Sequence, residues 1–178
     1  MKKLLFLILM LCAILPARAA ETPDAAMHTR PRFAWGAETG GSVDLSGNDM
    51  SSFDFNLSFG IRYRWLKFAG IGTGADIMVS NSCRTFPVYV RIATDFHTLP
   101  QLLFLDLKGG IGFNYLENNR QSTGAYAYSG LGINFARTAK FSSYMSIGYS
   151  FIQHRDKPDA IVTHSDLHMA TIKIGINF

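Results

Sequence analysis

Apolar and polar residues alternate along most of the chain from Arg32 onward, with the two-residue period of a β-strand. The clearest run extends from Phe53 to Trp65, where every second residue is apolar and the intervening residues are polar, small or charged. A helix would distribute the same residues all around its axis. We expect eight strands, whose apolar positions are Phe33, Trp35 and Ala37; Phe53, Phe55, Leu57, Phe59, Ile61, Tyr63 and Trp65; Ile71, Ala75 and Ile77; Phe86, Val88, Val90, Ile92 and Phe96; Leu103, Leu105, Leu107, Ile111, Phe113 and Tyr115; Leu131, Ile133 and Phe135; Phe141, Met145, Ile147, Tyr149 and Phe151; and Ile172, Ile174, Ile176 and Phe178.

The connections between these segments alternate in length. Short connections lie around Leu66 and Lys67, at residues 97–101 and at residues 137–140. The other connections are longer and more polar, at residues 41–51, 117–123 and 155–166, with residues 80–85 as a short exception. Gly, Asn and Asp in the longer connections are typical of turns.

Eight strands of this length close naturally into a barrel, because closure removes the unpaired edges of an open sheet. A soluble lipocalin-like barrel would point its apolar face inward, whereas a membrane barrel would point it outward. An eight-stranded barrel is only wide enough inside for packed side chains, so large apolar residues from most strands would not fit there. The sequence therefore predicts an all-β, eight-stranded antiparallel up-and-down transmembrane β-barrel with its small, polar and charged face inside.

The charges on the predicted inner face nearly balance, and an unpaired buried charge costs several kcal/mol. We therefore expect a lumen charge network of Glu38, Asp54, Arg62, Asp76, Arg91, Asp95, Asp106, Lys108 and Lys173. Two aromatic rims are expected on the outer face, as in barrels that span a bilayer. One rim comprises Tyr63, Trp65, Phe68, Phe96, Phe135, Phe141 and Phe178, and the other comprises Phe53, Phe86, Tyr115, Tyr149 and Phe151.

The first 19 residues are typical of a secretory signal peptide. Lys2 and Lys3 precede an apolar run of residues 4–15, and small residues flank Arg18 before the expected cleavage site. We expect residues 20–31 to form a short periplasmic segment and residues 32–178 to form the barrel. Cys12 would leave with the signal, so Cys83 is the single thiol of the mature chain, in a connection expected to be exposed and polar. Without the signal the chain has 14 basic and 13 acidic residues, which argues against a nucleic-acid partner.

The segment from Ala170 to the C-terminus alternates apolar residues and ends on Phe178. Together with the eight strands and the signal, it resembles the bacterial outer-membrane eight-stranded β-barrels of the OmpX and OmpA transmembrane-domain type. The resemblance implies an outer-membrane location in a Gram-negative bacterium, with the longer connections outside the cell. It also implies phospholipid, lipopolysaccharide, periplasmic chaperones, the barrel-assembly machinery and an unknown extracellular ligand as partners. The residues that would form the barrel-assembly signal are Ile172, Ile174, Ile176 and Phe178.

No catalytic, metal or cofactor site is expected. His164 and Ser165 are adjacent, so on a strand they would point to opposite faces and could not pair as base and nucleophile. His154, His164 and His168 flank the last long connection, but their spacing matches no recurrent metal-ligand motif. The favoured function is a non-enzymatic structural or loop-mediated surface role. The alternatives are a narrow small-solute channel and a lipid A-modifying hydrolase.

Overall fold

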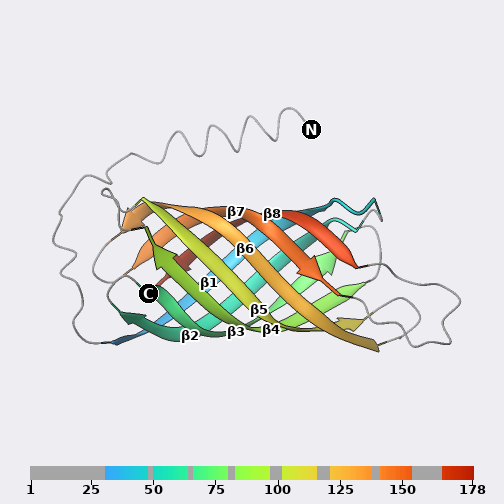
Figure 1. Ribbon diagram of the computed structural model, residues 1–178, viewed down its shortest axis with the longest axis horizontal. Coiled ribbons are helices and arrows are strands. Elements are labelled where there is room, and N and C mark those ends of the chain that lie inside the picture. Colours follow the sequence, from blue (N-terminus) through green and yellow to red (C-terminus); the bar gives the residue numbers. More distant parts are fainter. Residues whose placement is uncertain are drawn as a thin grey trace, which may run out of the picture.

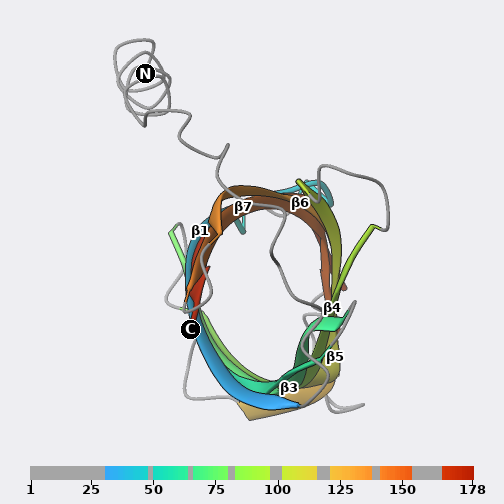
Figure 2. The same ribbon diagram turned by 90° about the vertical axis from the view of Figure 1, so that its left-hand side faces the viewer.

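The computed structural model describes residues 31–47, 50–63, 66–79, 83–96, 102–115, 121–137, 141–153 and 166–178. The strands are β1 (Arg32–Asp44), β2 (Ser52–Tyr63), β3 (Leu66–Met78), β4 (Arg84–Asp95), β5 (Leu103–Tyr115), β6 (Gln121–Arg137), β7 (Ser142–Ile152) and β8 (Leu167–Asn177). Each strand pairs antiparallel with its neighbours in chain order, and β8 pairs with β1 to close the barrel (Figures 1 and 2). The eight-stranded up-and-down barrel expected from the alternation is thus confirmed. The predicted signal peptide and periplasmic segment lie outside the described residues.

The two ends of the barrel differ. The loop end carries the connections at residues 45–51, 79–83, 116–120 and 153–166. The turn end carries the remaining connections, the start of β1 and the end of β8 (Figure 1). Among the described residues, no helix is long and apolar enough to cross a membrane.

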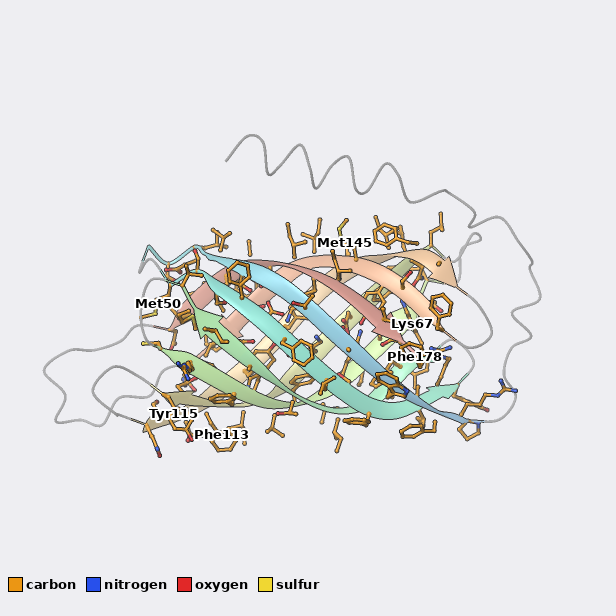
Figure 3. All side chains as sticks on the ribbon, turned by 180° about the vertical axis from the view of Figure 1, so that it is seen from behind. Met50, Lys67, Phe113, Tyr115, Met145 and Phe178 are labelled. Carbon is orange, nitrogen blue, oxygen red and sulfur yellow. The ribbon has the colours of Figure 1, made fainter. Side chains whose placement is uncertain are left out.

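Side chains along each strand alternate between the lumen and the outer surface, as the strand pleat requires. In β8, Ile172, Ile174 and Ile176 are exposed while Lys173 and Thr171 are buried. Among the exposed strand side chains that the structure describes, the only Lys, Arg, Asp or Glu residues are Arg32 at the turn end and Arg84 at the loop end. This apolar outer surface suits lipid, in which an Arg or Lys at mid-depth costs about 2–4 kcal/mol (Figure 3).

Both predicted aromatic rims contain outward side chains in the structure, with one correction. Phe96, Phe135 and Phe178 are exposed at the turn end, and Phe53, Phe86, Tyr115 and Tyr149 are exposed at the loop end. Phe68, expected on the outer rim, is instead fully buried inside the barrel. A register shift between Leu66 and Phe68 explains the difference, because the irregularity lets Lys67 and Phe68 both face inward.

Several strands extend beyond their predicted bounds. β1 continues to Asp44 and β4 begins at Arg84, both within residues that were expected to form connections. β3 begins at Leu66, so Leu66 and Lys67 belong to a strand rather than to a turn. β6 begins at Gln121, in the residues expected to form a long connection, and its first half places Tyr126 and Tyr128 in the lumen. Small outward residues such as Ala125 and Ala127 weaken the apolar alternation there and account for the missed half-strand.

β1 and β8 form the seam that closes the barrel. Beyond their ladder, Trp35 and Phe178 exchange two backbone hydrogen bonds, at 3.2 and 2.8 Å. Their rings stack outside with centroids 4.5 Å apart. Phe141 lies beside Phe178, at 6.3 Å between centroids. The last residue of the chain is therefore held at the seam by both its backbone and its side chain.

Candidate functional site

Four predicted lumen residues meet at the centre of the barrel. Arg91 of β4 donates from Nε to Asp106 Oδ1 at 2.9 Å and from Nη2 to Asp106 Oδ2 at 3.0 Å, a bidentate pairing. Arg91 Nη2 also lies 2.6 Å from Glu38 Oε1 of β1. Lys108 of β5 donates to the other oxygen of Glu38. Two carboxylates and two cations therefore neutralise each other across three strands.

Neutral polar groups complete the hydrogen bonding of this central cluster. Arg91 Nη2 donates to Tyr144 Oη at 2.7 Å, and Arg91 Nη1 donates to Asn177 Oδ1 at 3.3 Å. Tyr144 in turn donates to Glu38. All of these side chains are buried. The arrangement supplies the extra hydrogen bonds that a buried ion pair needs to offset its desolvation.

A second polar layer lies between the central cluster and the loop end. Lys173 Nζ lies 3.0 Å from Asp54 Oδ1. Asn56 donates to the same oxygen at 3.0 Å, and Ser42 Oγ lies 3.4 Å from Asp54 Oδ2. Asp76 is the cross-strand neighbour of Asp54 and is buried, and its Oδ1 has no hydrogen-bond partner among the described residues. This layer therefore holds two carboxylates beside one cation.

Aromatic rings cover the buried cations, which the sequence did not lead us to expect. Lys108 Nζ lies 5.3 and 5.1 Å from the ring centroids of Tyr89 and Tyr128. Lys67, absent from the predicted network, lies 3.3 Å from the ring centroid of Phe104. Such contacts favour a desolvated cation. The charges of the lumen are thus packed against rings, and the space between strands is filled by side chains.

Glycines make room for these rings. A Cβ at Gly132 would lie 2.1 Å from the ring of Phe104, its cross-strand neighbour. A Cβ at Gly72 would similarly lie 2.4 Å from the ring of Tyr89. Small residues were expected on the inner face of the barrel, where space is limited. In these two cases the space is occupied by an aromatic ring on the adjacent strand.

Apolar side chains close the lumen on both sides of the polar layers. The turn-end cluster consists of the buried residues Ala34, Phe68, Ala93, Phe104 and Tyr144. The loop-end cluster consists of the buried residues Met50, Met78, Cys83, Tyr89, Tyr126, Ile152, Leu167 and Met169. Cys83, expected in an exposed polar loop, is only 3% exposed and belongs to the loop-end cluster, because its side chain faces inward at the start of β4.

The remaining predicted residues lie elsewhere. Arg62 and Asp95 lie near the turn end of β2 and β4, away from the central cluster. His154 and His164 fall outside the described residues. His168 is exposed on the outer face, where its ring contacts Tyr149 and Phe151. In the part of the chain that the structure describes, no group of three or more His, Cys, Asp or Glu residues could hold a metal ion.

The predicted barrel-assembly residues form an outward stripe on β8 and at the chain end. Ile172, Ile174, Ile176 and Phe178 are all exposed on the outer face. Ser150, a hydroxyl near the last long connection, faces the lumen and shares a 2.7 Å hydrogen bond with Thr171. It is therefore remote from acyl chains outside the barrel.

No protein-family model matches the chain, and no curated protein matches it in sequence. Two solved structures share its architecture. Neisserial surface protein A superposes with a TM-score of 0.58 at 15% identity, over 83% of this chain and 97% of the other. The N-terminal β-barrel domain of Pseudomonas aeruginosa OprF gives a TM-score of 0.55 at 15% identity, over 84% of this chain and 100% of the other. Both are outer-membrane eight-stranded barrels, and the chain described here has the same transmembrane barrel fold.

Proposed function

We propose that the protein is a non-enzymatic outer-membrane barrel with a closed lumen, which acts as an envelope scaffold and makes its interactions through the connections at its loop end. The filled lumen carries this proposal. Arg91 and Lys108 are buried in a neutralised cluster between two apolar clusters, which supports a lumen without a continuous aqueous path. A rigid barrel with longer connections at one end is a common scaffold for surface recognition.

The outer-membrane location and its assembly are part of the same proposal. The apolar outer surface would contact phospholipid and lipopolysaccharide. The outward stripe that ends on Phe178 would be read by the barrel-assembly machinery after delivery by periplasmic chaperones. The fold shared with Neisserial surface protein A supports the proposal that part of the barrel is exposed at the cell surface.

Planar-bilayer recording tests the closed lumen against a narrow channel. The purified protein should give no discrete conductance steps at neutral pH. Steps that change in size when Arg91 or Lys108 is reversed in charge would contradict the scaffold and support a channel.

Mass spectrometry of lipid A after overexpression tests the hydrolase alternative. Unchanged lipid A spectra are expected, whereas a deacylated species would identify a hydrolase.

Epitope tags test the orientation. A tag inserted into the connection between β7 and β8 should bind antibody on intact cells, and the same tag between β6 and β7 should bind only after the outer membrane is opened. The reverse pattern would place the loop end in the periplasm and remove the basis for a surface role.

A further inference from the structure

Sulfur atoms are concentrated at the loop end of the lumen. The loop-end cluster contains three methionines, Met50, Met78 and Met169, together with the thiol of Cys83. Each is at most 6% exposed. Met145, by contrast, projects from the outer face of β7 (Figure 3). Most methionines of the described residues are therefore gathered in one buried place with the free cysteine.

The backbone register brings these residues together at or next to the loop-end termini of β2, β3, β4 and β8. Met78 donates its backbone N–H to the carbonyl of Cys83 at 3.2 Å, at the facing ends of β3 and β4. Ser52 pairs with Met78 across β2 and β3, and its Oγ lies 3.9 Å from Met169 Sδ of β8. Met50 precedes Ser52 by two residues and faces inward with it. Ser52 thus links the methionines of β3 and β8.

The polar layer beneath the cluster contains two carboxyl groups and one lysine. Asp54 and Asp76 are the next inward pair after Ser52 and Met78 along β2 and β3. Lys173 is the cation paired with Asp54, and Asp76 Oδ1 has no hydrogen-bond partner among the described residues. A cation bound among the neighbouring sulfur atoms would stabilise the ionised form of Asp76, which burial disfavours.

We propose that the loop-end cluster binds one soft monovalent metal cation, of the copper(I) and silver(I) class, through the thioethers of Met50, Met78 and Met169 and the thiolate of Cys83. Thioether and thiolate ligands select such ions over magnesium or calcium. Binding breaks the S–H bond of Cys83, forms a metal–sulfur bond and releases the proton to solvent. The metal keeps its oxidation state, so no oxidant or reductant is consumed.

Silver(I) is the redox-inert probe for this site. Folded protein in detergent, washed with chelator and kept free of chloride and thiols, is titrated with silver(I), and native mass spectrometry gives the stoichiometry. One tightly bound ion per chain is expected. In a second titration, the protein competes with a chromogenic chelator for copper(I). This titration should give the same stoichiometry, with one proton released per bound ion.

Matched variants distinguish a multi-ligand site from a reactive thiol. Loss of a residue that only hydrogen-bonds a metal ligand already weakens metal binding about 10- to 100-fold. Loss of a ligand itself, in Met169→Leu or Met78→Leu, should therefore weaken silver(I) binding at least about tenfold. Met145→Leu should leave it unchanged. Leucine preserves the volume of methionine closely, and gel mobility without boiling verifies that each variant folds.

Two results would overturn the proposal. One is the absence of a tightly bound ion in the wild-type protein, which would leave the methionines as packing residues only. The other is binding abolished by Cys83→Ser but unaffected by the Met78→Leu and Met169→Leu variants, which would reduce the site to a lone thiol.

Discussion

At the scale of single residues, Arg91 is bonded to several other side chains of the lumen. It contacts Glu38, Asp106, Tyr144 and Asn177, and no part of it is exposed. Its removal would leave carboxylates buried without their cation. Breaking a buried pair by deleting one partner costs more than the pair contributes, because the remaining charge stays desolvated.

Arg91→Met should therefore lower the free energy of unfolding by about 3–5 kcal/mol. Urea unfolding in detergent, followed by tryptophan fluorescence, measures the change. Arg84→Met removes the same charge from an exposed outward position and should alter stability by no more than about 0.5 kcal/mol. Equal effects of the two substitutions would mean that Arg91 is hydrated.

Lys173→Glu extends the same reasoning to the second polar layer. The substitution would place a third carboxylate beside Asp54 and Asp76, where Lys173 now lies 3.0 Å from Asp54. We expect a loss of several kcal/mol in the free energy of unfolding, partly recovered by a second substitution, Asp54→Lys. An unchanged urea midpoint for Lys173→Glu would show that this side chain is solvated.

At the scale of strands, glycine and aromatic residues face each other across the ladder. Gly132 on β6 pairs with Phe104 on β5, whose ring lies where a Cβ would be. Lys67 lies over the same ring, so Phe104 has little freedom to move away. The glycine is therefore required by packing between strands, in addition to any effect on its own backbone.

Gly132→Ala should destabilise the barrel by about 1–3 kcal/mol through overpacking. Gly109→Ala is the matched control, because a Cβ there would meet nothing within 4 Å. The same urea titration measures both. Adding Phe104→Leu should recover part of the loss in the Gly132→Ala background, and a lack of recovery would contradict the packing explanation.

At the scale of the whole molecule, the closed hydrogen-bonded ring leaves no free sheet edge. The barrel should therefore resist SDS at room temperature and migrate faster on a gel before boiling than after it. Phe178→Ala removes the ring stacked on Trp35 at the seam, worth about 0.5–1.5 kcal/mol, and should lower the temperature at which the two bands interconvert. Identical bands before and after boiling would contradict a closed barrel.

The order of the strands and the face that each presents were predictable, because alternation is a local property of the sequence. The predicted faces and bounds were wrong where the pairing between strands departs from a regular two-residue alternation, or where that alternation is weak. Lys67 and Phe68 both point inward because of an irregularity that no two-residue period reveals. Tyr126 and Tyr128 were missed because their outward neighbours are small. The burial of Cys83 likewise depends on residues of other strands, such as Met78 and Met169, that join it in the loop-end cluster.

The sequence by itself determined that eight two-faced strands form a barrel with an apolar exterior, since a narrow lumen cannot accept the large apolar face. It also predicted a charged inner face, although Lys67 was missing from that prediction. Only the tertiary structure decided the partners of those charges. Glu38, Arg91 and Asp106 lie on β1, β4 and β5, and their distances depend on how the closed barrel staggers its strands. The same stagger gathers the sulfur atoms of Met50, Met78, Cys83 and Met169, which come from three separate stretches of the chain, at one end of the lumen.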